Sequence, residues 1–178
     1  MLNLMIIDLE ATSEEVKTLG YRHEIIEIGA AKCYVSDSVW ETGDTFDCFV
    51  KPQINPILSK FIKELTSIEQ KDVSQAKIFP AVLDEFKKWI GANAFVFASF
   101  GKYDFNQMKY DCNLYLEQFP FSAQHCNLKT VIQKKMQLSK AKGCPTLVEE
   151  LQIEAELPEH RAINDVKNLI KICQKLQI

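Results

Sequence analysis

The sequence is poor in the residues that mark several large classes of protein. Its 178 residues include six glycines and six prolines, too few for a collagen-like or low-complexity chain. No apolar run approaches the roughly 20 residues that a membrane-spanning helix needs, and the start lacks the basic region and cleavage site of a signal peptide. With 47% hydrophobic and 25% charged residues, we expect a single globular domain over residues 1–178, away from membranes.

The six cysteines show no spacing that would mark a metal site or a disulfide framework. None forms a C-x-x-C pair, and none has a histidine at the spacing of a metal finger. A core of this size does not need covalent cross-links. We therefore expect reduced, mostly buried thiols in a cytoplasmic protein.

Charge is unevenly distributed along the chain. The net charge is −3, and residues 1–50 hold ten acids and three bases. Between Glu117 and Glu149 there is no acid but there are five lysines: Lys129, Lys134, Lys135, Lys140 and Lys142. Such a chain could bind cations at one place and phosphate at another. A solvated lysine face explains the second stretch equally well.

The hydrophobic pattern predicts three strands followed by alternating helices and strands. The first strands are expected at 2–9, 25–35 and 45–51, with a loop at 11–23 and a turn region at 36–43, a spacing that favours an antiparallel meander. Helices are expected at 56–66, 79–90, 103–116, 128–138, 145–151 and 163–176, and further strands at 94–100 and near 119–126. The pattern indicates an α/β fold with one mixed sheet flanked by helices.

Asp8 and Glu10 lie at the end of the first apolar strand, where two neighbouring carboxylates raise the free energy of the folded state. Alternate residues of a strand point to one face, so the two carboxylates would repel each other and lose hydration on burial. A hard divalent cation such as Mg²⁺ or Mn²⁺ would remove this repulsion. Two solvated acids at a strand end are the alternative, and D-x-E alone does not decide between them.

Asp104 and Asp165 each share a helical stripe with apolar residues. Asp104 heads its stripe, although an acid at a helix N-terminus also suits the helix dipole. Asp165 lies on the core-facing stripe of the last expected helix, where a buried carboxylate needs a partner or a metal. Because Pro158 is unfavourable within a helix, we expect the last helix to begin after it. His160 would then lie just before that helix and reach the same site from a loop.

Together these residues form the one catalytic constellation that the sequence offers. Acids at a strand end, a helix start and a helix face could converge on one metal site. The other histidines, His23 and His125, lack such a setting and are expected to be structural or on the surface. The sequence contains no P-loop, G-x-S-x-G, H-E-x-x-H or G-x-G-x-x-G motif.

Three segments resemble the exonuclease motifs of the DEDDh superfamily. They are Asp8-Leu-Glu10, Phe100-Gly-Lys-Tyr-Asp104 and His160-Arg-Ala-Ile-Asn-Asp165. Segments 8–15, 49–52, 58–68 and 79–83 extend the resemblance over nearly the whole chain. It is closest to the branch that contains the histone-mRNA 3′ exonucleases and their bacterial relatives. The resemblance implies a ribonuclease H-like fold, in agreement with the expected three-strand meander.

The resemblance also implies roles for individual residues. The metal-binding acids would be Asp8, Glu10, Asp104 and Asp165, and His160 would be the general base. Positions that touch the terminal nucleotide would be Glu10, Ala11, Leu65, Thr66 and His160. The implied activity is hydrolysis of single-stranded RNA 3′ ends to 5′-mononucleotides with two divalent ions, Mg²⁺ or Mn²⁺.

Two positions depart from the family pattern, and two other functions stay open. Ala162 stands where glycine is frequent and Asn164 where an acid is frequent, but neither change removes a ligand. Because the first strand begins at Leu2, we expect no nucleic-acid-binding domain before it, which speaks against histone stem-loop recognition. The alternatives are a DNA exonuclease and a nucleic-acid-binding module without catalysis, although the intact acid set argues against the latter. No obligate protein partner is evident.

Overall fold

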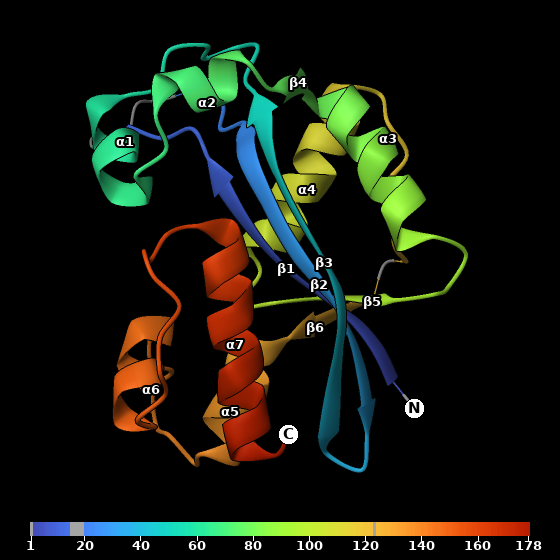
Figure 1. The fold of residues 1–178 in the computed structure, drawn as a ribbon, viewed down its shortest axis with the longest axis vertical. Helices are drawn as coiled ribbons and strands as arrows, with labels where there is room; N and C mark the ends of the chain where they lie inside the picture. Colours follow the sequence, from blue (N-terminus) through green and yellow to red (C-terminus); the bar gives the residue numbers. More distant parts are fainter. Residues whose placement is uncertain (1, 15–19, 123) are drawn as a thin grey trace.

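A computed structural model describes residues 2–14, 20–122 and 124–178 (Figure 1). Within them, a six-stranded sheet has the strand order β4-β3-β2-β1-β5-β6. The loop predicted over 11–23 includes residues 15–19, which lie outside the described residues. The strands are β1 (Leu2–Ala11), β2 (Ile25–Ser36), β3 (Val39–Lys51), β4 (Lys77–Ile78), β5 (Val96–Ser99) and β6 (His125–Asn127).

The sheet is mixed, as the sequence predicts. The strands β1, β2 and β3 pair antiparallel in chain order and form the expected meander. On its other edge β1 pairs with β5 in parallel, and β6 is parallel to β5. Because β1 and β5 run in the same direction, the residues that follow them meet at one end of the sheet.

The turn between β2 and β3 is shorter than predicted. Instead of a turn region over 36–43, the chain turns at Asp37 and Ser38, whose φ angles are 50° and 64°. Left-handed values at both central residues are typical of a two-residue hairpin turn, and aspartate tolerates them. Since Ser36 already pairs with Val39, residues 39–43 belong to β3.

Helices cover both faces of the sheet (Figure 1). Helices α3 and α4 pack on one face, α5, α6 and α7 pack on the other, and α1 and α2 cover one end. No helix in the described part of the chain is long and apolar enough to cross a bilayer. The helices are α1 (Lys60–Thr66), α2 (Gln70–Ser74), α3 (Phe79–Ile90), α4 (Tyr103–Leu114), α5 (Leu128–Lys135), α6 (Cys144–Glu150) and α7 (Ala162–Leu176).

The first helix is shorter than predicted, and two elements are not predicted at all. α1 begins at Lys60 and not near residue 56, because the Ser59 hydroxyl caps it by accepting a hydrogen bond from the Ile62 N–H at 3.1 Å. Ile57, which the predicted helix would include, lies before α1 and is 75% exposed. With five and two residues, α2 and β4 are too short for a hydrophobic period to reveal them.

The alternation along β1 decides which way the two acids point. Odd-numbered residues of Met5–Leu9 lie in the core under α3 and α4, whereas Leu4 and Ile6 lie in the core under α7. Asp8 and Glu10 continue the even-numbered series at the end of the strand. They therefore face the side of the sheet on which α7 packs.

Gly29 allows the start of α7 to lie directly on β2. A Cβ atom at this position would stand 2.3 Å from the carbonyl carbon of Ala162, closer than packed atoms can approach. The glycine is thus required by the close approach of two backbones. Its position fixes where the first turn of α7 stands relative to the sheet.

Gly29→Ala should lower the free energy of unfolding by about 3 kcal/mol, because the added methyl forces backbone shifts. Gly143→Ala is the matched control, since the nearest atom to its Cβ would be Pro145 Cδ at 3.8 Å. Chemical denaturation of both variants measures the effect. Equal stability of Gly29→Ala and the wild type would contradict the close approach.

Candidate active site

One pocket brings together all five residues predicted to be metal ligands or the general base. The pocket has a volume of about 290 Å³. Its lining includes Asp8 and Glu10 from β1, Asp104 from α4, His160 from the segment before α7, and Asp165 from α7. Residues separated by most of the chain therefore meet at one place.

The end of β1 supplies two carboxylates to the pocket. Asp8 is partly buried, and Glu10 is 9% exposed. The regular pairing between β1 and β2 continues as far as Glu10, which stands opposite Glu27, and shifts at Ala11. Both acids are thus held by ladder hydrogen bonds at the centre of the sheet, where their backbone has little freedom to move.

Asp104 reaches the pocket through the turn that joins β5 to α4. Gly101 in this turn has a φ of 116°, which a residue with a side chain rarely adopts. Asp104 then falls in the first turn of α4, where it is 5% exposed. Its Oδ1 accepts a hydrogen bond from the Leu9 N–H at 3.3 Å. This bond attaches α4 to β1 between the two acids of the strand.

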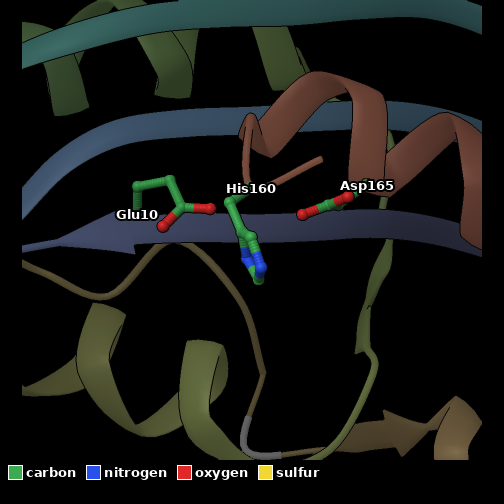
Figure 2. A group of neighbouring side chains, drawn as sticks. All are labelled: Glu10, His160 and Asp165. Carbon is green, nitrogen blue, oxygen red and sulfur yellow. The ribbon is translucent and has the colours of Figure 1, made fainter. Parts of the chain in front are cut away.

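The start of α7 completes the pocket (Figure 2). Glu10, His160 and Asp165 offer ligand atoms that all lie within 4.8 Å of one another. In Figure 2 the two carboxylates point toward each other, with His160 between them. His160 has a left-handed backbone with a φ of 56°, and α7 begins at Ala162. The prediction that His160 precedes the helix is confirmed.

Burial and mutual repulsion make the acids of the pocket hard to ionise. Burial, and then the charge of Asp165, raises the pKa of Glu10 to about 9. Burial likewise raises the pKa of Asp104 and of Asp165 to about 6. The pKa of Asp8 is raised well above its ordinary value by burial and by the nearby Asp104 and Glu10. Each carboxylate opposes the ionisation of the others.

The donor set fits a divalent cation. Carboxylate oxygens are hard ligands of the kind that Mg²⁺ and Mn²⁺ prefer. Glu10, His160 and Asp165 are close enough for one ion to contact all three. Asp8 and Asp104 add further oxygens to the same pocket. A cation would supply the positive charge that this cluster of acids otherwise takes up as protons.

The other residues predicted to touch a nucleotide do not line the pocket. Ala11 is 6% exposed. The Thr66 hydroxyl is fully buried, donating to the Ile62 carbonyl oxygen at 2.8 Å and accepting from the Ile68 N–H at 3.1 Å. Leu65 is 38% exposed. Contact with a nucleotide stays a prediction for these positions, and the Thr66 hydroxyl is already engaged at the end of α1.

The two remaining histidines have structural partners. His23 Nδ1 lies 2.6 Å from the carbonyl oxygen of Thr12. His125 Nε2 lies 3.0 Å from the Ser99 hydroxyl, and its ring stacks on Phe105 with 4.8 Å between the ring centres. Neither histidine is among the residues that line the pocket.

The lysines of the acid-free stretch differ in their surroundings. Lys142 forms an ion pair with Glu150 at 2.5 Å, and Lys135 donates to a carbonyl oxygen near the C-terminus at 3.2 Å. Lys129 Nζ lies 5.2 Å from the ring centre of Phe100, which lines the pocket. Lys129 is therefore placed beside the pocket, whereas the charge of Lys142 is already balanced.

Phe100, Tyr103 and Cys144 also line the pocket but have no role in the sequence-based prediction. Phe100 and Tyr103 belong to the segment that contains Asp104, whereas the approach of Cys144 depends on tertiary packing that no local pattern reports. All six cysteines are free. An ion pair joins the buried Glu27 of β2 to the partly exposed Arg161 beside His160. The sequence does show an acid that interrupts the apolar run of β2 at Glu27, but it does not show the pairing with Arg161.

The fold and the pocket define a class of protein. A mixed sheet with two acids at the end of its first strand, a third acid after a parallel strand and a His–Asp pair at the last helix is the arrangement of a ribonuclease H-like nuclease. The sequence profile of the family described as Exonuclease matches residues 5–173. The chain belongs to this family, and the proteins similar to it include exoribonucleases and a DEDDh family member.

Three relatives illustrate the relationship. The 3′-5′ exoribonuclease 1 of Rattus norvegicus is 27% identical over 182 residues, covering 97% of this chain and 52% of the relative. The 3′-5′ exonuclease eri1 of Schizosaccharomyces pombe is 41% identical over 83 residues, 46% of this chain and 27% of the relative. The nuclease domain of 3′hExo, a DEDDh family member bound to rAMP, is 28% identical with a TM-score of 0.86 and covers 97% of this chain and 90% of that chain. The chain thus spans about half the length of the rat relative, and the ribonuclease H-like fold is confirmed.

Metal-free protein should lose stability as the pH rises through the range in which these acids ionise. The folded-state pKa values, about 6 for Asp165 and about 9 for Glu10, exceed the values of about 4 expected in the unfolded chain. The folded state therefore binds protons more tightly. This contribution to the free energy of unfolding is complete below pH of about 4 and is lost as the pH rises through about 6 and toward 9.

Thermal unfolding of the protein in a chelator, repeated from acidic to basic pH, measures this contribution as the slope of stability against pH. Asp165→Asn should flatten the metal-free slope relative to the wild type, whereas Glu41→Gln, on the exposed part of β3, should not. Saturating Mn²⁺ should also flatten the slope, because the metal replaces the protons. A metal-free slope that is the same in Asp165→Asn and the wild type would contradict the raised pKa of Asp165.

Proposed function

We propose that this protein is a metal-dependent 3′–5′ exonuclease that releases 5′-mononucleotides from the 3′ ends of single-stranded RNA. The observation that carries the proposal is the convergence of four carboxylates and one histidine in a single pocket. Membership of the exonuclease family supports the reaction type. The rat relative is named an exoribonuclease, and the 3′hExo nuclease domain is bound to rAMP, which supports RNA as the substrate.

His160 would act as the general base. Its ring lies beside the carboxylates of Glu10 and Asp165, in the pocket that would hold the reacting phosphate. The neutral imidazole would take a proton from a water molecule whose oxygen attacks the terminal phosphorus. The bond from phosphorus to the 3′ oxygen of the preceding nucleotide would break, and that oxygen would take up a proton. Because His160 is partly exposed, the proton could then pass to solvent.

Two divalent ions, Mg²⁺ or Mn²⁺, would be held by the acids of the pocket: Asp8, Glu10, Asp104 and Asp165. When bound, they would offset the carboxylate charge, make a water molecule more acidic and stabilise negative charge on the leaving oxygen. The protein's own contribution is to hold the acids in place. Asp104, for example, is fixed to β1 by its bond to the Leu9 N–H.

The walls of the pocket suit a nucleotide. Tyr103 is 52% exposed and Phe100 lies next to the acids, so both offer aromatic surface on which a base could stack. Lys129 beside Phe100 offers a positive charge for a phosphate farther along the bound RNA. These residues would orient the 3′ end so that its last phosphate faces the acids.

Turnover of labelled single-stranded RNA and DNA of one sequence, with Mn²⁺ and with a chelator, tests the proposal. RNA should shorten from its 3′ end with Mn²⁺ and stay intact in the chelator. Asp8→Asn should abolish turnover, and His160→Ala should lower kcat by about 10²–10⁴-fold. Asp44→Asn, an exposed acid of β3, is the matched control. Faster hydrolysis of DNA would assign a DNA exonuclease, and binding without hydrolysis would identify an inactive binding module.

Lys129→Gln should weaken the binding of single-stranded RNA and reduce its salt dependence. The slope of log K against log salt should fall by about 0.7, the effect of one lost phosphate contact on a single strand. Binding is measured in the Asp8→Asn background, so that the RNA survives. Lys142→Gln is the matched control, because Lys142 already pairs with Glu150. An unchanged slope in Lys129→Gln would mean that this lysine is only solvated.

A further inference from the structure

β2 carries a buried carboxylate whose hydrogen bonds all go to the segment that follows His160. Glu27 is completely buried. Its Oε1 accepts hydrogen bonds from Arg161 Nε at 3.0 Å and Nη2 at 2.7 Å, and its Oε2 accepts one from the Ala162 N–H at 2.9 Å. Both oxygens of Glu27 are thus bound to two consecutive residues at the start of α7.

These bonds stand where a helix usually provides its own cap. Arg161 is the N-cap residue of α7, but its side chain makes no capping hydrogen bond. The N–H groups of a first helical turn have no partners within the helix. Glu27 satisfies the first of them, that of Ala162, from the neighbouring strand. Its negative charge also lies at the positive end of the helix dipole.

The backbone of His160 needs such support. Its φ of 56° lies in the left-handed region, which is unfavourable for a residue with a side chain. Hydrogen bonds fix the residues that follow it. Arg161 and Ala162 are bound to Glu27, and the Arg161 carbonyl oxygen accepts a hydrogen bond from the Asp165 N–H at 3.0 Å. One short segment therefore sets the positions of both His160 and Asp165.

The same strand also fixes this segment relative to Glu10. Glu27 stands directly opposite Glu10 in the pairing of β2 with β1. Two residues farther along β2, Gly29 touches the backbone of Ala162. The guanidinium of Arg161 is turned away from the reacting groups, since it is bound to Glu27 and lies 5.1 Å from the ring centre of Phe49.

We propose that Glu27 and Arg161 are a positioning pair, which holds His160 and Asp165 in the geometry that the pocket needs. Neither side chain touches the reacting atoms. The pair acts through the backbone of the segment from His160 to Asp165. The effect of the pair on turnover rests on the function proposed above. The positioning of His160 and Asp165 is tested separately, through the affinity for Mn²⁺.

The test compares three variants of the pair. Glu27→Gln keeps the shape of the side chain and removes its charge, Arg161→Met removes the guanidinium, and Arg161→Lys keeps the charge but not the planar fork. Glu27→Gln and Arg161→Met should lower kcat on single-stranded RNA by about 10–100-fold and weaken Mn²⁺ binding to the metal-free protein by a similar factor, with KM changed by less than about threefold. Arg161→Lys should recover part of both losses.

Lys171→Gln is the matched control. It breaks the ion pair of 2.8 Å between Lys171, in the second half of α7, and Glu156, which precedes the helix, and should leave kcat and Mn²⁺ binding unchanged. All measurements are made at a temperature at which circular dichroism shows the variants folded. If Glu27→Gln does not fold, the two Arg161 variants decide.

The possible outcomes separate this proposal from the function on which it rests. If Glu27→Gln and Arg161→Met match the control in both kcat and Mn²⁺ affinity, the pair only stabilises the fold and the proposal is wrong. If the wild type hydrolyses neither RNA nor DNA, the proposed function fails. In that case Mn²⁺ affinity still decides: a loss in these two variants supports the positioning role, and equal affinity overturns it.

Discussion

The carboxylates of the pocket repel one another, so packing elsewhere in the protein must hold them together. Four acids share one pocket, and each raises the cost of ionising the others. Left to themselves, such side chains would turn toward solvent. They remain together because their backbones are fixed by elements with large apolar faces: β1 between its two neighbours, α4 after β5, and α7 across the sheet.

The two cores on either side of the sheet supply the stability that offsets this repulsion. One core packs β1 and β2 against α3 and α4, and the other packs the opposite faces of these strands against α5, α6 and α7. Hydrogen bonds then refine the positions at the end of the sheet. The bond from the Leu9 N–H to Asp104 and the bonds from the start of α7 to Glu27 attach two helices to neighbouring strands.

Much of this arrangement could be predicted because it depends on short-range periodicity. The alternation along β1 put Asp8 and Glu10 on one face, and the apolar stripe of α3 gave its boundaries correctly. The resemblance to a known family connected acids that lie far apart in sequence. These signals together predict the mixed sheet, the meander and the four acids and one histidine that meet in the pocket.

The parts that could not be predicted depend on pairings between distant residues or on very short elements. Glu27 and Arg161 are 134 residues apart, so their pairing has no local pattern, although an acid within an apolar strand was visible. The elements α2 and β4 are too short to show a period. The sequence predicts a longer turn than the hairpin at Asp37 and Ser38, because polar residues continue into the exposed half of β3.

The order of the elements along the chain has a consequence for biosynthesis. β1 is made first and α7 last, yet the pocket needs both, since His160 and Asp165 stand next to Glu10. A nascent chain that still lacks α7 holds three of the acids without their remaining partners. The complete cluster therefore comes into being only after α7 has left the ribosome and packed on the sheet.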